Sequence, residues 1–434
     1  MSKKANRFFQ IQNATSFNIP VDINHEFYTD FSEYRSTSIE KKLFRLLGIE
    51  HSSKECNDTD HQKIFLSGYR GTGKTSELLT IKQKIDDTQC YLPVFVDIAN
   101  EELDVNNIET VDILILMVEK LLAELESRGA DISNLESIKE FFDWYSSKIV
   151  KELNNKLEGS AQVETGFNTD TTILGKLLGI FANTKLKLAG SQESKTIIRR
   201  EITNNFTIFS DRVNEFIRSI VKELKRKEKY QDILFIVDGF EKIGSLDDRE
   251  KILIRDSNKL TKISTHMIIT LPIELFEQRT KIIHIGEILN FPLVNLAKDG
   301  AKEKFREFIL KRVDETLFDS SETIDLIVKY GAGHPRQTLQ IIKRAYIVAE
   351  KDIIDKKSVE DAIEILGNEL SKVNEDEIKI LKQIKDGKPI PFSKVFAKLK
   401  SENVIFEYDN NLDSHIINPV VLQNSDFNKL LEQI

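Results

Sequence analysis

The chain has 434 residues and a net charge of −8, from 62 basic and 70 acidic side chains. This balance excludes a general attraction to nucleic acid or to an anionic membrane, so any such contact has to be local. The length predicts two or three domains, at roughly 100 to 200 residues each. Cys56 and Cys90 are too few for a disulfide framework or a metal quartet, and we interpret them as incidental thiols in a reducing compartment.

The N-terminal part of the chain carries no apolar signal segment, and the sequence contains no run of about eighteen apolar residues. We therefore expect a soluble, cytoplasmic protein with no membrane span. Residues 8–34 mix polar and aromatic side chains, residues 38–47 predict an amphipathic helix, and residues 51–61 predict a polar linker.

The most informative segment is residues 64–79, IFLSGYRGTGKTSELL, which predicts a strand, a glycine-rich turn and a helix. Glycines let the backbone aim several N–H groups at one point, and the helix adds the positive end of its dipole, so phosphate is the expected guest. Lys74 can reach the β and γ phosphates of a nucleotide, and the Thr75 hydroxyl can ligate a bridging magnesium ion. The predicted phosphate-binding residues are Gly68, Tyr69, Arg70, Gly71, Thr72, Gly73, Lys74, Thr75 and Ser76.

Strands and helices alternate beyond this loop, as in proteins built on a parallel sheet. Residues 91–98, 233–237 and 266–270 predict buried strands, and residues 110–127, 137–157 and 198–228 predict helices. Asp238 follows the second of these strands directly. An Asp at the carboxyl end of a neighbouring parallel strand lies at the same edge of the sheet as the loop and can hold magnesium through a water molecule.

Polar residues also follow the later elements. Thr270, at the end of its strand, either bonds a γ phosphate or the attacking water or simply belongs to a turn. Residues 330–336, YGAGHPR, place Pro335 at the first position of a helix and Arg336 in its first turn. Because an arginine there opposes the helix dipole, it needs another reason to be present, and contact with phosphate is one.

Together these motifs resemble the AAA+ and STAND ATPases, especially initiator-like members with a winged helix after the ATPase core. The resemblance covers roughly residues 27–421 and implies an α/β fold: a P-loop NTPase three-layer sandwich with a parallel sheet, followed by a helical lid and a small winged-helix domain. The implied domains are a P-loop ATPase core at 1–300 with an insertion at about 158–197, the lid at 301–370, and the winged-helix-like domain at 371–434.

The resemblance also implies ATP and Mg²⁺ as cofactors, with Lys74 and Asp238 in the catalytic machinery. In this family a Gly-x-Pro element begins the lid next to the nucleotide, which suggests His334 and Arg336, on either side of Pro335, as nucleotide sensors. The chain departs from the family at Gly239, where efficient ATPases place a Glu that polarises the attacking water. Glu241 is the nearest substitute, and a surface Glu beside Lys242 is an equally good interpretation. A slow ATP-dependent switch is therefore expected.

The C-terminal region predicts helices at 375–386 and 391–401 and strands at 404–408 and 415–420, around a turn at 409–411, which suggests a winged helix. Residues 351–434 contain twelve lysines, no arginine and sixteen acidic residues. Since base reading favours guanidinium groups and a positive balance, this composition favours protein docking or autoinhibition over DNA contact.

Residues 158–195 interrupt the ATPase pattern. They predict an inserted helical hairpin or flexible lid, with a partner-binding or membrane-touching element as the alternative. In ring-forming ATPases an arginine from a neighbouring subunit stabilises charge on the transferred phosphate. The candidates for such a finger are Arg199, Arg200, Arg279 and Arg312.

Two functions fit these observations. The favoured one is an ATP-binding, slowly hydrolysing molecular switch that acts on a protein effector or through self-assembly. The alternative is an ATP-dependent, nucleic-acid-binding initiator or loader, against which the net acidity counts. A small-molecule kinase is disfavoured, because the rest of the chain predicts helices and a terminal hairpin rather than an acceptor pocket.

Overall fold

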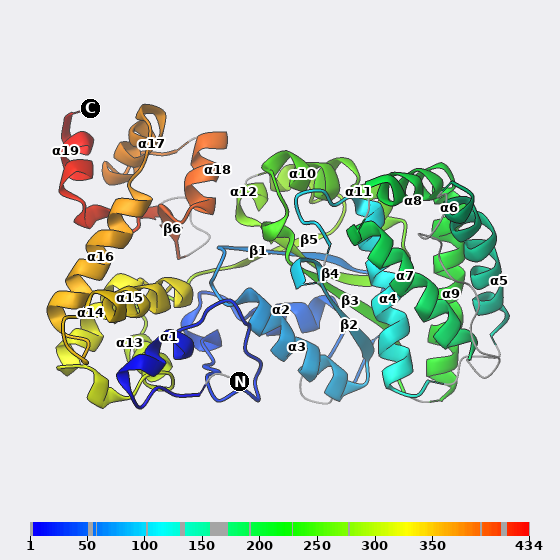
Figure 1. The fold of residues 1–434 in the computed structure, drawn as a ribbon, viewed down its shortest axis with the longest axis horizontal. Coiled ribbons are helices and arrows are strands. Elements are labelled where there is room, and N and C mark those ends of the chain that lie inside the picture. The colour runs from blue at the N-terminus through cyan, green and yellow to red at the C-terminus, as the bar shows by residue number, and fades with distance from the viewer. Residues whose placement is uncertain are drawn as a thin grey trace.

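The computed structural model describes residues 3–50, 55–57, 59–100, 103–130, 135–156, 172–190, 192–227, 229–276, 278–390, 393–408 and 415–433. A sheet lies in the middle, a block of helices extends on one side of it, and the helices that follow residue 300 lie on the other (Figure 1). Within this described part, no helix is both long and apolar enough to cross a membrane.

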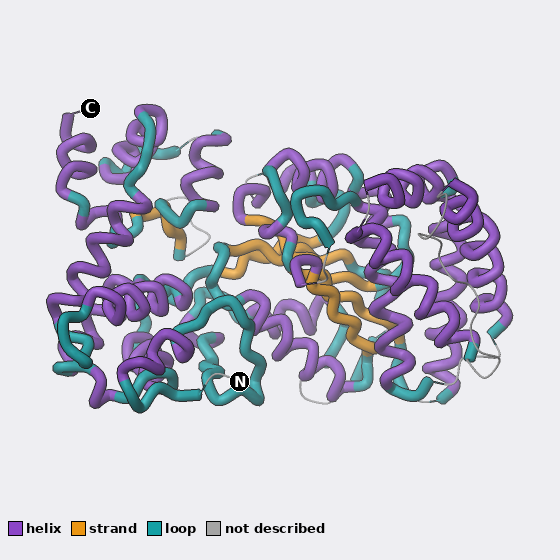
Figure 2. Tube along the Cα trace, in the orientation of Figure 1, coloured by secondary structure: helices purple, strands orange, loops and turns teal. Residues whose placement is uncertain are grey.

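The central sheet is entirely parallel. Its strands lie together in the middle of the molecule, with helices around them (Figure 2). Among the described residues its strand order is β2-β3-β4-β1-β5. The strands are β1 (Lys63–Gly68), β2 (Tyr91–Asp97), β3 (Asp232–Asp238), β4 (His266–Pro272) and β5 (Glu287–Phe291). The predicted strands are confirmed as β1 to β4. The sequence does not predict β5, because this edge strand is only partly buried and lacks a continuous apolar run.

Different helices cover the two faces of the sheet, since successive side chains of a strand point to opposite faces. Ile64 and Leu66 of β1 pack in one core with α2 (Ile39–Leu46) and α3 (Lys74–Thr88). Phe65 packs in a second core with α4 (Thr110–Ser127). The result is the predicted three-layer α/β sandwich, with the glycine-rich loop between β1 and α3.

Beyond α4, further helices enlarge one layer (Figure 1). They are α5 (Glu136–Tyr145), α6 (Lys151–Lys156), α7 (Ile173–Gly190), α8 (Gln192–Asn204) and α9 (Phe206–Arg226). The single helix predicted at 198–228 is instead two helices that meet at Asn205. Within the predicted insertion, α7 buries Leu177, Ile180 and Phe181 in the same core as α4. Residues 158–171 of that insertion lie outside the described part of the chain. The short helices α10 (Leu246–Glu250) and α11 (Ser257–Thr261) lie between β3 and β4, and α12 (Ile273–Phe276) lies between β4 and β5.

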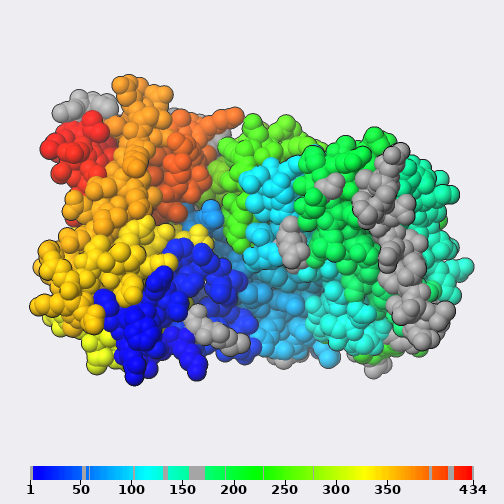
Figure 3. Space-filling model, viewed as in Figure 1, coloured from blue at the N-terminus to red at the C-terminus, as the bar shows by residue number. Residues whose placement is uncertain are grey.

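A further hydrophobic core joins the two ends of the chain. Its helices are α1 (Ile11–Ala14), α13 (Ala301–Leu310), α14 (Ser321–Gly331), α15 (Pro335–Val348), α16 (Lys356–Leu370), α17 (Glu375–Lys385), α18 (Lys394–Ser401) and α19 (Ser425–Gln433). From the N-terminal segment, Phe27 and Phe31 pack beside Phe305 and Phe308 of α13. In the space-filling view the N-terminal residues lie beside the lid helices and reach across to the sheet domain (Figure 3).

The C-terminal module is a pair of helices followed by a hairpin, in the predicted order. Strands β6 (Ile405–Glu407) and β7 (His415–Ile417) pair antiparallel after α17 and α18. The predicted turn at 409–411 and the first two residues of the predicted helix at 391–401 lie outside the described residues. The winged-helix assignment stays a prediction.

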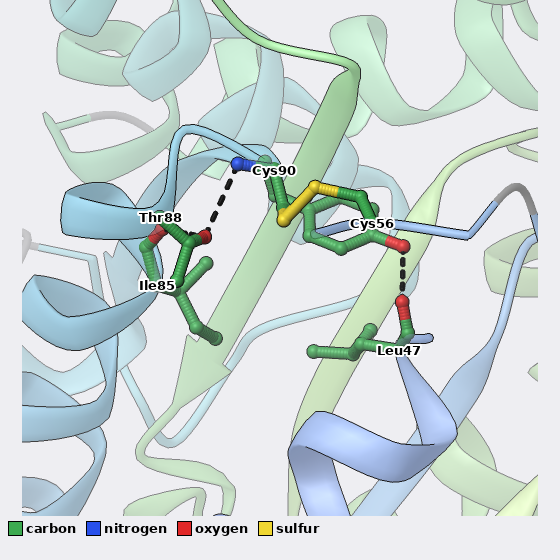
Figure 4. Close-up of a disulfide and its surroundings, with 6 residues drawn as sticks. Leu47, Cys56, Ile85, Thr88 and Cys90 are labelled. Atoms are coloured by element: carbon green, nitrogen blue, oxygen red, sulfur yellow. Dashed lines mark hydrogen bonds between the residues drawn. A yellow bond between two sulfur atoms is a disulfide. The ribbon is translucent and has the colours of Figure 1, made fainter. Parts of the chain in front are cut away.

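Cys56 and Cys90 form a disulfide, so their interpretation as incidental thiols is wrong (Figure 4). Their Cα atoms lie 5.6 Å apart, within the usual range for a bridge. A β-bridge between Ile49 and Cys56 holds the linker in place, and Thr88 Oγ1 accepts the N–H of Cys90 at 3.1 Å. A cysteine count carries no information about this proximity, because the fold brings together residues 34 positions apart.

Candidate functional site

Three glycines give the loop after β1 its shape. Gly71 and Gly73 both have φ of +93°, a conformation that L side chains rarely adopt. At Gly68 an added Cβ would lie 2.6 Å from the carbonyl oxygen of Phe291 in β5. The loop thus turns tightly into the N-terminus of α3, as the sequence predicts.

Lys74 and Thr75 open α3 and point into the site. Lys74 is 4% exposed, and its Nζ donates to the carbonyl oxygens of Gly68 and Tyr69 at 2.7 and 2.8 Å. Burial lowers the pKa of Lys74 below its usual range, and the Glu241 and Asp238 carboxylates oppose that shift. The Thr75 hydroxyl donates to Oδ2 of Asp238 at 2.6 Å. The structure therefore brings the loop and the end of β3 together.

Asp238 and Glu241 leave oxygen atoms without partners in this site. Oδ1 of Asp238 and Oε2 of Glu241 are buried and have no hydrogen-bond partner in the described structure. Burial and the nearby Glu241 carboxylate raise the pKa of Asp238 to about 6. Buried unpaired carboxylate oxygens are costly unless a cation or water satisfies them. The Thr75 hydroxyl and the Asp238 carboxylate are hard oxygen donors that fit Mg²⁺, and the Glu241 carboxylate lies near them.

Gly239 and Thr270 shape the turn after Asp238. Gly239 has φ of +102°, and its N–H donates to Oγ1 of Thr270 at 3.1 Å. A Cβ on Gly239 would lie 3.3 Å from the Ala99 nitrogen. Both conformation and space disfavour a Glu at this position. Thr270 is fully buried and does not line the cavity of the site, so its observed contact is with the turn.

His334 joins the start of α15 to the loop. Its Nδ1 accepts the backbone N–H of Gln337 at 3.1 Å, so the neutral ring carries its proton on Nε2. Nε2 then donates to the carbonyl oxygen of Arg70 at 3.0 Å. Burial, reinforced by the Arg336 charge, lowers the pKa of His334 to about 3. His334 therefore works as a neutral clamp between lid and loop.

Arg336 covers the same loop. Its backbone N–H donates to the Gly71 carbonyl oxygen at 3.2 Å, and a Cβ on Gly71 would lie 2.7 Å from Cβ of Arg336. Nε of Arg336 is buried and has no hydrogen-bond partner among the described residues. Pro335 occupies the first turn of α15, as predicted. Both residues line the same cavity as the loop.

A cavity of about 550 Å³ opens beside the loop. In the described structure its walls come from the loop and Glu241, from residues 16–35, and from α13 and α15. The Val21 N–H donates to Ser76 Oγ at 3.1 Å, which fastens the N-terminal segment to α3. The apolar part of the wall consists of Phe17, Phe27, Phe31, Phe308 and Leu339. This volume is typical of small-molecule and cofactor sites.

Arg35 is a site residue that the sequence does not reveal. It is 5% exposed, and it donates to the carbonyl oxygen of Thr72 at 2.8 Å and to that of Pro292. Its guanidinium lies 3.9 Å from the centroid of the Phe291 ring, and burial lowers its pKa to about 10. Arg35 thus ties the N-terminal segment and the end of β5 to the loop. Because its partners are backbone carbonyl groups, no residue pattern marks it.

The candidate arginine fingers have different surroundings. Arg199 is buried and donates to the Asp112 carboxylate. Arg312 is buried in the wall of the chain's own cavity. Arg200 and Arg279 are exposed. An arginine that serves a neighbouring subunit has to reach that subunit, so only the last two keep the access that such a role requires.

A second polar cluster lies at the opposite edge of the sheet. The Nε2 atoms of His61 and His266 lie 3.7 and 3.8 Å from Oδ2 of Asp232. Nδ1 of His266 accepts the Gln62 N–H at 3.2 Å, so the neutral ring carries its proton on Nε2. A protonated ring nitrogen cannot ligate a metal ion, and we interpret the cluster as two imidazole rings that lie close to one carboxylate.

Comparison with known proteins assigns no family. No protein-family profile and no curated protein matches this sequence. Among solved structures, the chain is similar to a RuvB variant from Thermotoga maritima, with 13% identity, a TM-score of 0.34, and coverage of 92% of this chain and 97% of that chain. It is also similar to the Orc1 protein from Aeropyrum pernix, solved in complex with DNA, with 11% identity, a TM-score of 0.32, and coverage of 91% of both chains. Function has to be argued from the site, since values this low carry no functional conclusion.

Proposed function

We propose that this chain is an ATP-binding and slowly ATP-hydrolysing molecular switch of the AAA+/STAND type that acts on a protein partner or effector. The observation that carries the proposal is the 2.6 Å hydrogen bond from Thr75 to Asp238. Beside it, carboxylate oxygens of Asp238 and Glu241 have no partner in the described part of the chain. A glycine-rich loop opening a helix, with hydroxyl and carboxylate donors beneath it, is suited to a nucleotide phosphate and its magnesium ion.

In the proposed mechanism the loop N–H groups and Lys74 neutralise the phosphates. Lys74 would exchange its bonds to the Gly68 and Tyr69 carbonyl groups for phosphate oxygens. Thr75 and Asp238 would hold Mg²⁺, which neutralises phosphate charge when bound. Glu241 lines the cavity and would orient the attacking water.

The switch part of the proposal rests on how the cavity is built. Its walls belong to the loop, the N-terminal segment and the lid, so a ligand that contacts all three can change their relative stability. His334 and Arg336 both connect the lid to the loop backbone. These two residues are the proposed route from the phosphates to the lid.

The proposed partner is a protein rather than nucleic acid. Residues 351–434 carry twelve lysines, sixteen acidic residues and no arginine. A nucleic-acid interface favours a positive stripe and guanidinium groups, which this region lacks.

The test is ATP·Mg²⁺ binding by calorimetry, together with hydrolysis, for wild type, Lys74→Ala and the control Lys82→Ala. Lys82 lies on the same helix and pairs with Glu124 outside the cavity. We expect slow ATP hydrolysis that does not change when DNA is added. This hydrolysis should be lost in Lys74→Ala and retained in Lys82→Ala. Unchanged ATP affinity in Lys74→Ala would remove the loop from the proposal. Turnover that is stimulated by DNA and weakened by added salt would favour the initiator or loader instead.

A further inference from the structure

Arg312 lies in the cavity wall just beyond the end of α13. Its side chain is buried, with 4% exposure for the whole residue. The guanidinium carbon lies 4.0 Å from the ring centroid of Phe308 and 5.0 Å from that of Phe27. A donor-rich cation therefore lies among aromatic rings in the cavity.

This guanidinium has unused hydrogen-bonding capacity. One terminal nitrogen donates to the Phe308 carbonyl oxygen at 3.0 Å, while the buried Nε has no partner among the residues that the structure describes. No carboxylate in the described part of the chain forms a salt bridge with it, and burial alone lowers the pKa of Arg312 to about 9. The group stays charged at neutral pH. A buried cation without a counter-charge is destabilising, so its presence calls for a ligand that uses it.

The position of Arg312 indicates which part of a nucleotide it would meet. The phosphate end of the cavity is formed by the loop and Arg336, whose charge interacts with Arg70 and Glu241. Arg312 belongs to a different part of the cavity wall, beside the ring of Phe27 from the N-terminal segment and that of Phe308 from α13. Its neighbours Phe27 and Phe308 are aromatic, and aromatic side chains are suited to stacking on a base.

We propose that Arg312 is a specificity-determining residue that recognises the purine base of the nucleotide by donating to a ring nitrogen. A guanidinium offers five N–H donors and no acceptor, while adenine offers the acceptors N1, N3 and N7. The aromatic rings around Arg312 would stack on the base, and an N–H group of the guanidinium would fix the orientation. This inference rests on the proposed nucleotide-binding function and adds the part of the site that selects the base.

The test measures binding rather than activity. The affinities of ATP and of its 1-deaza, 3-deaza and 7-deaza analogues are compared by calorimetry for wild type, Arg312→Met and Arg306→Met. Arg306 lies on α13 and pairs with Asp325 outside the cavity, so it is the matched control. In wild type and in Arg306→Met, we expect one analogue to bind about tenfold or more weakly than ATP, as for a lost hydrogen bond to a charged group. In Arg312→Met that difference should fall to about twofold or less.

Two results would overturn the inference alone: all three analogues binding like ATP in wild type, or discrimination that persists in Arg312→Met. Failure of wild type to bind ATP would overturn the proposed function as well, so the two failures can be told apart. If Arg312→Met does not fold, Arg312→Lys keeps the buried charge but not the planar set of donors. The inference requires the discrimination to fall in that variant too.

Discussion

The rings of Tyr69 and Phe406 meet edge to face, with centroids 5.8 Å apart and planes at 86°. Tyr69 belongs to the glycine-rich loop, and Phe406 belongs to strand β6 of the C-terminal module, where it is fully buried. Phe406 also stacks on His334 at 5.6 Å, and the Tyr408 hydroxyl donates to the Ala332 carbonyl oxygen at 2.7 Å. The hairpin thus rests directly on the loop and on the turn that begins α15, so the C-terminal module is placed to respond to what the loop binds.

Replacing Phe406 by Leu should uncouple the hairpin from the loop. An edge-to-face aromatic pair contributes about 0.5–1.5 kcal/mol beyond the burial of its area, and Leu cannot supply it. We expect hydrogen exchange of β6 and β7 to depend on ATP in wild type and to lose that dependence in Phe406→Leu. Phe427→Leu, in the buried part of α19, is the control and should keep it. Nucleotide-dependent protection that survives in Phe406→Leu would contradict the coupling.

Glu241→Gln should separate binding from hydrolysis. The change keeps the size of the side chain and removes its basicity, so ATP affinity should hold while kcat falls by a factor on the order of 10²–10⁴, typical of a lost general base. Single-turnover hydrolysis and calorimetry on the same preparation measure the two quantities. The exposed Glu287→Gln serves as the control. Equal loss of binding and turnover would indicate a structural role for Glu241.

Gly239→Glu should not create a faster ATPase. At φ of +102° a side chain strains the backbone, at a cost of about 1–3 kcal/mol. We expect lower thermal stability and no gain in kcat. Gly190→Ala, where an added Cβ meets no atom of the described residues within 4 Å, should be nearly neutral. A stable and faster Gly239→Glu variant would show that the turn after Asp238 can adopt the family pattern.

Reduction of the Cys56–Cys90 bond should destabilise the protein. In the loop-entropy description, a cross-link between residues 34 positions apart lowers the entropy of the unfolded chain, and this stabilises the folded protein by about 3–4 kcal/mol. We expect a lower melting temperature with reductant, and the same decrease without it in the Cys56→Ser, Cys90→Ser double variant. Thiol titration of the denatured protein supplies the independent check, since free thiols before reduction would contradict the bond.

Much of the site could be predicted from the sequence because its parts are short motifs in chain order. The glycine pattern fixes the loop, and an Asp at the end of an apolar strand predicts the Thr75–Asp238 contact, since parallel strands end at the same edge of a sheet. The sequence also shows that Gly239, rather than a Glu, follows Asp238. It does not show what disfavours a Glu there, which is a positive φ at Gly239 and the nearby backbone of Ala99.

The features that the sequence does not predict depend on contacts with residues far away in the chain. Arg35 bonds to carbonyl groups of Thr72 and Pro292, and a carbonyl group is present in every residue. The disulfide needs the fold to bring Cys56 beside Cys90. Strand β5 is held in the sheet by its pairing with β1, and its own sequence has no apolar pattern that predicts a strand. In each case tertiary structure supplies the missing information.

The clamp formed by His334 should make stability depend on pH. The folded protein holds the pKa of His334 at about 3, below its ordinary value of 6.5, because the ring is buried and lies near Arg336 and Lys74. Between these two pH values the unfolded chain binds a proton at this site and the folded chain does not. The contribution of His334 to the free energy of unfolding is therefore fully present above pH 6.5. It falls as the pH drops below 6.5, by up to about 1.4 kcal/mol per pH unit.

Denaturant unfolding of wild type and His334→Asn from pH 7.5 to 4.5 measures this dependence. Asn can still cap α15 but does not titrate, so the variant should start less stable and lose less stability on acidification. The exposed His284→Asn should retain the wild-type slope. Parallel slopes for wild type and His334→Asn would mean that His334 is protonated without cost in the folded protein, and the neutral clamp between the lid and the loop would have to be abandoned.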